Sequence, residues 1–388
     1  MNSVTSFLLD ELRNRRVDPV VLDTPVAVED IPTPALMIDL DAFEANLARM
    51  QTYLAGKGLG LRAHSKMHKC PHIAKQQLAA GAIGICCAKV AEAEVMQAAG
   101  VMPILLTSPV ASAENIERVA RLAAENAELQ VVIDDPESAS RLNAALTSEL
   151  GVLIDLDPGM GRTGIEPMEP ALGLARHVAD HCPNLRFDGL QMYAGNCMHV
   201  EGFEARQSKY SHVMKRGAET LALFRDNGFE AKVFSGGGTC TFNMEADLGL
   251  MTDLQAGSYL FMDIEYRDIG GATSAVFDDF EQALFVLVTA ISKPQERLIT
   301  VDGRFKSFSS DKMAPQFRDV EGVIFHWGGD EHGIVQLNNP SAEMAIGNKY
   351  FMLPPHCDPT VNLHDYYYPV RDGQVTELWP VAGRGCSQ

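Results

Sequence analysis

The sequence lacks the surplus of basic residues that proteins use to bind nucleic acids or anionic membranes. Its 388 residues include 32 Lys and Arg against 51 Asp and Glu, a formal net charge of −19 at pH 7. Because so acidic a chain repels phosphate groups, we expect neither a nucleic-acid nor a membrane partner. A small-molecule substrate is the partner that remains, since a local basic pocket can still hold an anion.

Long apolar runs are also missing, and none approaches the ~20 residues that cross a bilayer. The N-terminal stretch MNSVTSFLLDELRNRR places its charges after its short apolar run, the reverse of a secretory signal peptide. The eight cysteines form no CxxC pair, and in a chain of this length without a secretion signal we expect reduced thiols. These absences predict a cytoplasmic protein.

What the sequence does have, from about residue 57 to 262, is short apolar runs alternating with amphipathic stretches. Stretches such as ENIERVARLAAENA and ALGLARHVADHC repeat apolar residues at the spacing of a helix. Alternating strands and helices predict βαβ units, and eight such strands close a (β/α)8 barrel of ~250 residues. A doubly wound open sheet is the competing prediction. The predicted strands are 59–65, 83–88, 104–107, 129–133, 152–155, 185–193, 233–236 and 254–260.

The pattern divides the chain into three parts. Residues 1–30 form an N-terminal extension, 31–275 the barrel domain and 276–388 a C-terminal β-domain. After residue 275, short apolar runs such as KYFMLPP are split by Gly, Pro and Asp and show little helical period. The first strand of the middle part, 34–40, is expected to join the β-domain.

A lysine stands at the rim of the first barrel strand, in the segment RAHSKMHK. Barrel enzymes keep catalytic residues at the C-terminal ends of their strands. Neighbouring cationic groups should lower the pKa of Lys66 and favour the free amine that Schiff-base chemistry needs. Alternation favours Lys66 over Lys69, because Arg62, His64 and Lys66 share one face. The alternative is a solvated basic turn that opens a helix.

Two glycine-rich segments follow the last two predicted strands, at residues 235–239 (SGGGT) and 257–259 (GSY). Glycines let backbone N–H groups approach a phosphate closely, and Ser and Thr hydroxyls add donors. Barrel phosphate sites recur in the loops after strands seven and eight. These segments therefore predict a phosphate site, with plain turns as the alternative.

Three further segments hold candidate site residues. His356 and Asp358 lie two apart, so in an extended segment both point the same way and suit Zn²⁺ or Mn²⁺, while Cys357 points away. A hydrogen-bonded histidine in a turn is the alternative. Arg162 could meet a cofactor or a carboxylate, or it could pair with a nearby aspartate in its turn. Gln191 and Tyr193 share a face that looks into the barrel mouth, although Tyr193 could belong to the core.

Together these segments resemble the family of D-threonine aldolases, 3-hydroxy-D-aspartate aldolases and eukaryotic-type D-serine dehydratases, within the alanine-racemase-like fold. RAHSKMHK is similar to that family's R-P-H-x-K-T-H-K, with Ala63 for Pro and Met67 for Thr. The segments GICCAKVAEAEVM, LIDLDPGMGRTG, GLQMYAG, SGGGT, LQAGSYLFMD and PPHCDPTVNLHD follow in the family's order. The resemblance covers nearly the whole chain.

The resemblance implies a pyridoxal-phosphate enzyme: a (β/α)8 barrel of alanine-racemase type plus a C-terminal β-domain that carries metal ligands. It implies that Lys66 carries the cofactor as a Schiff base and that His356 and Asp358 bind a divalent metal (Mn²⁺, Zn²⁺ or Mg²⁺). It also implies a homodimer. The positions that match cofactor-binding residues are Arg162, Gln191 and Tyr193 along the ring, and Ser235, Gly236, Gly237, Thr239, Gly257, Ser258 and Tyr259 at the phosphate.

Family dehydratases tend to have Cys where Asp358 stands, so the resemblance favours an aldolase. We expect a lyase that cleaves D-3-hydroxy amino acids of the D-threonine or 3-hydroxyaspartate type to glycine and an aldehyde. His199 is the candidate base, with His64 and His68 as competitors. The alternatives are a dehydratase of D-serine or 3-hydroxyaspartate and a non-enzymatic cofactor-binding protein. Candidates for binding a distal substrate carboxylate are Arg304, Lys306 and His326.

Overall fold

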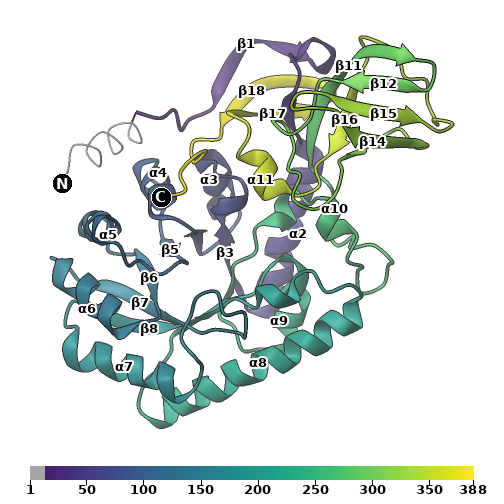
Figure 1. Ribbon diagram of the computed structural model, residues 1–388. Helices are drawn as coiled ribbons and strands as arrows, with labels where there is room; N and C mark the ends of the chain where they lie inside the picture. The colour runs from purple at the N-terminus through teal and green to yellow at the C-terminus, as the bar shows by residue number, and fades with distance from the viewer. Residues whose placement is uncertain (1–13) are drawn as a thin grey trace.

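In the computed structural model, which describes residues 14–388, eight short parallel strands close into a barrel (Figure 1). The two-residue strand β10 completes the ring by pairing with both β9 and β3, which excludes the open sheet. Nearly every strand residue is buried, as in parallel strands that are covered on both faces. The barrel strands are β3 (Gly60–His64), β4 (Gly84–Cys87), β5 (Ile104–Leu106), β6 (Gln130–Ile133), β7 (Leu150–Asp155), β8 (Leu185–Met192), β9 (Val233–Gly236) and β10 (Asp253–Leu254).

The helices begin and end where local chemistry favours it. Helix α6 starts at Pro136, and the preceding Asp135 carboxylate accepts the Ser138 N–H at 2.7 Å. Helix α2 ends at Lys57 and is followed by Gly58, whose φ of 71° is left-handed. Within residues 14–388, no helix has both the length and the apolar character that crossing a bilayer requires. The helices are α2 (Leu40–Lys57), α3 (Pro71–Ala79), α4 (Val90–Ala98), α5 (Ala113–Glu125), α6 (Pro136–Ala145), α7 (Glu169–His181), α8 (Phe203–Asp226), α9 (Phe242–Leu248), α10 (Ile264–Arg267) and α11 (Cys357–Val361).

A ten-stranded sheet forms the second lobe, in the order β1-β18-β17-β2-β11-β12-β15-β14, with β16 paired to β11 and β13 to β16. The strand expected over 34–40 is β2, and it lies between β17 and β11 in this sheet. The mostly-strand character expected after residue 275 is confirmed, whereas the domain boundaries stay predictions. The strands are β1 (Val20–Ala27), β2 (Ala35–Asp39), β11 (Leu284–Gln295), β12 (Leu298–Val301), β13 (Gln316–Phe317), β14 (Val323–Trp327), β15 (Gly333–Leu337), β16 (Lys349–Leu353), β17 (Tyr366–Arg371) and β18 (Gln374–Pro380).

The N-terminal extension predicted over 1–30 falls only partly within the described residues. Its first 13 residues lie outside them. The later part contains β1, which pairs with the C-terminal strand β18 in an antiparallel register. The two ends of the described chain therefore meet in one sheet.

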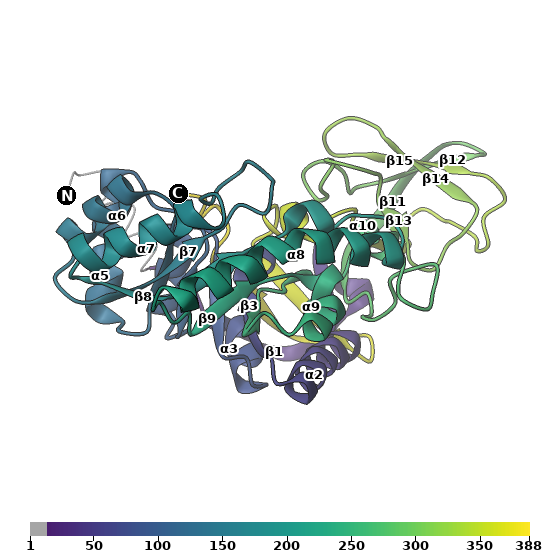
Figure 2. The same cartoon turned by 90° about the horizontal axis from the view of Figure 1, so that it is seen from below.

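The second lobe reaches the mouth of the barrel through α11 and β17. The Tyr367 hydroxyl donates to the His68 carbonyl at 2.6 Å, and the Cys357 N–H donates to the Asp263 carboxylate at 2.8 Å. These bonds set α11 beside the 3₁₀ turn Ser65–Met67 that follows β3. Figure 2 shows the two lobes side by side, with β12, β14 and β15 at the end away from the barrel.

The last barrel strand is shorter than the sequence predicts. A strand is expected over 254–260, but β10 ends at residue 254 and Ser258–Leu260 form a 3₁₀ turn. The chain leaves the sheet to pack Gly257 closely against β3, where a Cβ would lie 3.0 Å from the His64 carbonyl oxygen. All of the predicted strand except its first residue is therefore wrong, and the segment instead forms part of the barrel mouth.

Candidate active site

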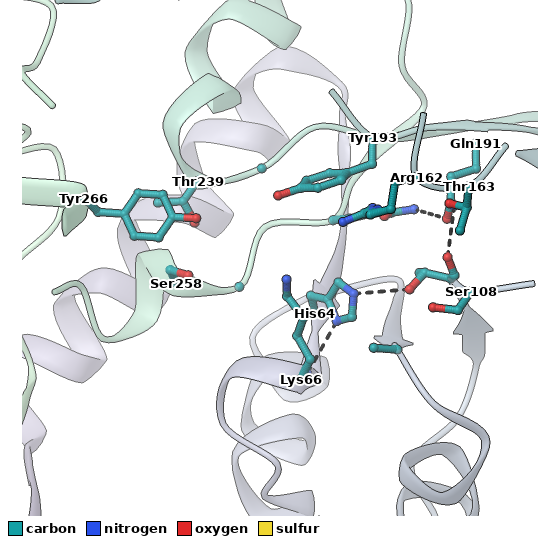
Figure 3. Close-up of a pocket in the computed structure, with 15 residues that line it drawn as sticks. His64, Lys66, Ser108, Arg162, Thr163, Gln191, Tyr193, Thr239, Ser258 and Tyr266 are labelled. Atoms are coloured by element: carbon teal, nitrogen blue, oxygen red, sulfur yellow. Dashed lines mark hydrogen bonds between the residues drawn. The ribbon is translucent and has the colours of Figure 1, made fainter. Parts of the chain in front are cut away.

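A cavity of about 250 Å³ opens at the C-terminal ends of the barrel strands (Figure 3). Its walls come from segments far apart in the sequence, as expected for a barrel mouth. Four predicted residues do not line it: Ser235 and Gly236 end β9, Gly237 follows them, and Tyr259 lies in the 3₁₀ turn after β10. The predicted site residues that line it are Lys66, Arg162, Gln191, Tyr193, Thr239, Gly257 and Ser258.

Lys66 directs its amine into this cavity from the turn after β3 (Figure 3). Its Nζ lies 3.9 Å from Oδ1 of Asp358, a residue of the second lobe. This carboxylate raises the pKa of Lys66 and outweighs burial and Arg162, which lower it. The lowered pKa expected from the sequence is therefore wrong.

The cationic neighbours of Lys66 fail to lower its pKa because the fold occupies them elsewhere. Arg62 points into the barrel interior and pairs with Asp253 at 3.3 Å. Burial, together with nearby cations such as Lys66 itself, holds the pKa of His64 well below its usual range, so that ring is neutral. The charge with the largest effect on the pKa of Lys66 is that of Asp358, a residue far from Lys66 in the sequence.

Of the three candidate bases, only His64 lines the cavity, but both of its ring nitrogens already have partners. His64 Nδ1 accepts the Lys66 N–H at 3.4 Å, and its Nε2 contacts the Thr107 hydroxyl at 3.3 Å. His68 is fully buried, and burial lowers its pKa to about 3. His199 differs, because its side chain is 38% exposed and its Nδ1 lies 3.0 Å from Oε1 of Glu265. His199 does not line the cavity, but it combines an exposed side chain with a ring that Glu265 fixes.

Glu265 lies between two of the predicted site histidines. Its Oε1 bonds to His199, and its Oε2 lies 3.8 Å from Nδ1 of His356. Burial would raise the pKa of Glu265, but hydrogen bonds from His199 and Lys312 lower it to about 2. An ionised carboxylate can only accept, so the neutral form of the His199 ring has its proton on Nδ1 and a lone pair on Nε2.

His356 and Asp358 face each other, with 3.8 Å between Nε2 and Oδ2. His356 Nδ1 lies 3.0 Å from Oδ2 of Asp311, the arrangement by which a carboxylate fixes a metal-binding imidazole. The segment is not extended as expected, because α11 begins at Cys357. The two side chains nevertheless meet. The backbone N–H of Cys357 donates to the Asp263 carboxylate, and its buried thiol lies 3.7 Å from Oδ2 of Asp358.

His356 and Asp358 together supply few ligands for a metal ion. Within residues 14–388, no group of three or more His, Cys, Asp and Glu is arranged to hold a metal ion. An ion held by His356 and Asp358 would therefore need water or substrate to complete its coordination. Such open positions suit a catalytic metal better than a structural one.

The two glycine-rich loops leave backbone donors free at the edge of the cavity. The N–H groups of Thr239, Gly257 and Ser258 donate to no group among residues 14–388. The loops are tied together, because the Tyr259 N–H donates to the Thr239 hydroxyl at 2.9 Å. Gly237 has a left-handed φ of 64°, and a Cβ there would collide with the Glu245 carboxylate. Free N–H groups of this kind fit a phosphate.

The buried Glu245 under this loop predicts a pH-dependent stability. Burial raises the pKa of Glu245 to about 8, so between about pH 5 and 8 the folded chain keeps a proton that the unfolded chain loses. Stability should fall as the pH rises through this window. Replacing Glu245→Gln should remove up to about 1.4 kcal/mol of that loss per pH unit. Urea unfolding at pH 5, 6, 7 and 8 measures it, and equal slopes for both proteins would refute the assignment.

Arg162 does not pair with the aspartate in its turn. The Asp157 carboxylate instead accepts the backbone N–H groups of residues 159–161 at 2.7–3.2 Å. The Arg162 guanidinium lies 5.3 Å from the centre of the Tyr193 ring, and Figure 3 shows the two side by side. Tyr193 is therefore part of the cavity wall rather than of the core.

The cations proposed for a distal carboxylate lie in the second lobe, and none of them lines the cavity. The Arg304 guanidinium stacks on the Phe305 ring at 3.3 Å. Lys306 pairs with Glu331, and His326 Nε2 lies 3.3 Å from the Gln336 side chain. All three residues therefore contact other groups of the second lobe, and no contact links them to the cavity.

Sequence reasoning missed several residues that the fold brings to the site. Gln255 and Tyr266 line the cavity, while Glu265 and Asp311 orient histidines beside it. Gln255 stands two residues before Gly257, so strand alternation could have placed both on one face. The two carboxylates carry no comparable signal, because acidic residues are common on any surface.

Comparisons with known proteins agree with the family that the motifs suggest. The family model of the alanine racemase N-terminal domain matches residues 38–265, and that of a putative serine dehydratase domain matches 283–370. The solved structure of D-threonine aldolase from Filomicrobium marinum has a TM-score of 0.91 and 37% identity, and the alignment covers 95% of this chain and 100% of that one.

Curated relatives point the same way. A 3-hydroxy-D-aspartate aldolase of Paracoccus denitrificans (strain Pd 1222) is 36% identical over 92% of this chain and 93% of its own. A D-threonine aldolase of an Arthrobacter species is 36% identical over 92% and 94%. A D-threo-3-hydroxyaspartate dehydratase of Delftia sp. (strain HT23) is more distant, at 28% identity over 90% and 97%.

Proposed function

Because this chain belongs to the family of D-threonine and 3-hydroxy-D-aspartate aldolases built on the alanine racemase N-terminal domain, we propose that it cleaves D-3-hydroxy amino acids to glycine and an aldehyde. One observation carries the proposal. A lysine amine in the barrel mouth lies 3.9 Å from an aspartate that faces a histidine, Asp358 with His356. This geometry supports a covalent anchor for the cofactor beside a pair of metal ligands.

The cavity fits pyridoxal phosphate. Lys66 would hold the aldehyde carbon through its amine, and the free N–H groups of Thr239, Gly257 and Ser258 would hold the phosphate. When bound, the cofactor supplies an electron sink for the electron pair left on Cα as the Cα–Cβ bond breaks. The residues proposed to shape the phosphate loops and to flank the ring are Ser235, Gly236, Gly237, Tyr259, Arg162, Gln191 and Tyr193.

His356 and Asp358 are the residues that would hold a divalent metal, Mn²⁺, Zn²⁺ or Mg²⁺. Asp311 on Nδ1 of His356 supports this role, since it directs the Nε2 lone pair towards Asp358. A metal held there would act as a Lewis acid on the 3-hydroxyl of the substrate. The pair lies beside the lysine, so the hydroxyl and Cα of one small molecule can reach both.

His199 takes the proton from the 3-hydroxyl in this proposal. Glu265 holds Nδ1–H, so Nε2 is free to accept. Replacing His199→Gln should lower the rate of cleavage by roughly 10²–10⁴-fold while leaving the cofactor bound. Glycine release and the visible spectrum, measured on the same sample, test both parts. A rate within threefold of the parent protein would rule out His199 as the base.

Product analysis tests the function directly. The protein is incubated with D-threonine and with D-threo- and D-erythro-3-hydroxyaspartate, and glycine, aldehyde, 2-oxo acid and ammonia are measured. Glycine and an aldehyde in equal amounts support the aldolase and also identify the preferred side chain. A cofactor-loaded protein that is inert to every 3-hydroxy amino acid would favour a non-enzymatic binding role and overturn the proposal.

A dehydratase is the second candidate, favoured by the match of residues 283–370 to a putative serine dehydratase domain. A dehydratase would remove the Cα proton and expel the hydroxyl, giving a 2-oxo acid and ammonia. Asp358 argues for the aldolase, because this carboxylate, and not the fully buried Cys357 thiol, faces Nε2 of His356. The same product analysis separates the two reactions.

We also propose that the protein works as a homodimer in the cytoplasm, with domain boundaries near residues 30 and 275. The family resemblance supports the dimer. All eight cysteines are unpaired and buried, which supports a reducing compartment. Light scattering coupled to gel filtration tests the dimer, since a mass near the 42.3 kDa of one chain would contradict it.

A further inference from the structure

Arg206 is a buried charged residue that has no part in the proposed function. It lies in the first turn of α8, and its side chain is fully buried. Arginine is rarely buried without an ionic partner, but no carboxylate within residues 14–388 forms an ion pair with it. Burial lowers the pKa of Arg206, and the charge of Asp279 only partly opposes this, yet a guanidinium keeps its proton. A buried charge without a counter-charge is costly, and an anion that binds nearby reduces the cost.

The guanidinium of Arg206 donates to four backbone carbonyls instead. One of these acceptors belongs to the 3₁₀ turn Thr239–Thr241, whose first residue lines the cavity. The charge is therefore held directly behind a turn that carries one of the predicted phosphate donors. The carbonyl oxygens belong to Cys240 at 3.1 Å, Val200 at 2.9 Å, Ile269 at 3.3 Å and Gly270 at 2.8 Å.

The phosphate end of the cavity has donors but no cation of its own. Its free N–H groups belong to Thr239, Gly257 and Ser258 and are uncharged. The two cations that line the cavity within residues 14–388 are Lys66 and Arg162. Figure 3 shows Arg162 on the opposite side of Lys66 from Thr239 and Ser258. Because a phosphate ester carries almost two negative charges at neutral pH, neutral donors leave most of its charge uncompensated.

The buried carboxylates near this turn do not neutralise Arg206. Glu245 lies against Gly237, and burial raises its pKa to about 8, so it is mostly uncharged at pH 7. Hydrogen bonds outweigh burial and lower the pKa of Glu265 to about 2, but Lys312 is its counter-charge. The carboxylate of Asp263 accepts two backbone N–H groups. The charge of Arg206 is therefore still available to an anion in the cavity.

We propose that Arg206 is the counter-charge of the cofactor phosphate and acts through the turn Thr239–Thr241 without touching the phosphate. This role rests on the proposed function, since it requires the phosphate to lie at that turn. Water and salt screen a fully buried charge only weakly, so its attraction for a dianion stays strong. The attraction should raise the affinity for a phosphate ester by about tenfold or more.

The test compares the affinity of the apoprotein for pyridoxal phosphate with its affinity for pyridoxal, which has the same aldehyde and no phosphate. The ratio of the two affinities isolates the phosphate, because both ligands need the Lys66 amine. Arg206→Met should lower this ratio at pH 7 by about tenfold or more. Arg118→Met is the matched control, since Arg118 is a buried arginine on α5 that pairs with Glu94 at 2.6 Å. Its ratio should equal that of the parent protein.

Arg206→Lys separates the charge from the hydrogen bonds and covers the case in which Arg206→Met fails to fold. At pH 7 its ratio should lie within about threefold of the parent's, because a cation is kept. By pH 10 a buried ammonium loses its proton and arginine does not, so the ratio should fall about tenfold or more below the parent's. Glu245 ionises over this range in both proteins, so comparing them at each pH cancels its effect.

Two results would overturn the role of Arg206. One is an equal ratio in the parent protein and Arg206→Met. The other is a larger loss than threefold in Arg206→Lys at pH 7, which would assign the effect to the hydrogen bonds and not to the charge. If the cofactor is nevertheless attached to Lys66, the proposed function stands. A parent protein that attaches the cofactor to no lysine would overturn both.

Discussion

Replacing Lys66 by alanine abolishes the visible absorbance of the lysine-bound cofactor and lowers cleavage of D-3-hydroxy amino acids by at least about 10³-fold. Lys66 is the one lysine that lines the cavity within residues 14–388, so no neighbouring amine can replace it. The measurement is the absorbance spectrum of the reconstituted variant together with glycine release from D-threonine and 3-hydroxyaspartate.

Two further variants separate the amine from its charge. Lys66→Arg keeps a cation beside Asp358 but lacks a nucleophilic amine, so it should lose as much as the alanine variant. Lys75→Ala removes an exposed lysine of α3 that pairs with Asp18, and it should keep both absorbance and turnover. If Lys66→Arg kept both the absorbance and the turnover, a positive charge alone would be sufficient for activity. The proposal that Lys66 bonds covalently to the cofactor would then be wrong.

Replacing His356→Ala or Asp358→Ala lowers aldol cleavage by about 10³-fold while the cofactor stays attached. Removal of a Lewis acid costs several kcal/mol of stabilisation of the developing alkoxide, which corresponds to this loss of rate. A chelator should do the same to the parent protein, and Mn²⁺ or Zn²⁺ should restore the activity. Cleavage that is indifferent to chelation would refute the metal role of both residues.

A graded series of variants refines the metal prediction. Asp311→Asn weakens the carboxylate on Nδ1 of His356 without removing a ligand, so metal affinity should fall by about 10–100-fold and excess metal should rescue cleavage. Asp330→Asn is the matched control, since Asp330 pairs with Arg304 at 3.8 Å in the second lobe. Identical metal affinity in all three proteins would contradict the arrangement.

The barrel could be predicted because strand and helix periods leave separate traces in the sequence. Seven of the eight strands lie within a few residues of their predicted bounds, as β9 over Val233–Gly236 illustrates. The prediction for residues 254–260 was wrong, because a short buried apolar run has the same sequence pattern in a strand and in a buried turn. What bends this chain is the close packing of Gly257 on His64, a contact between segments far apart in sequence.

The site was predictable where its residues lie together in one motif. Lys66, Thr239 and Gly257 all line the cavity as expected. Residues that act across the lobes were harder, because Glu265 reaches His199 and Asp311 reaches His356 only after the chain has folded. No sequence spacing encodes these contacts, and acidic residues are frequent in this chain.

The pKa of Lys66 shows the same limit in electrostatic terms. Local sequence offered only cations, from which a lowered pKa followed. The fold turns Arg62 inward to Asp253, leaves His64 neutral and brings Asp358 to 3.9 Å, so the pKa is raised. Charge arguments from a sequence window fail when the nearest opposite charge is almost 300 residues away.

Borohydride trapping followed by peptide mapping tests the central claim most directly. The holoprotein is reduced, digested and searched for a pyridoxyl group on lysine. We predict one labelled peptide, that which contains RAHSKMHK, with the label on Lys66 rather than on Lys69. A label on any other lysine, or an unlabelled protein, would contradict the account.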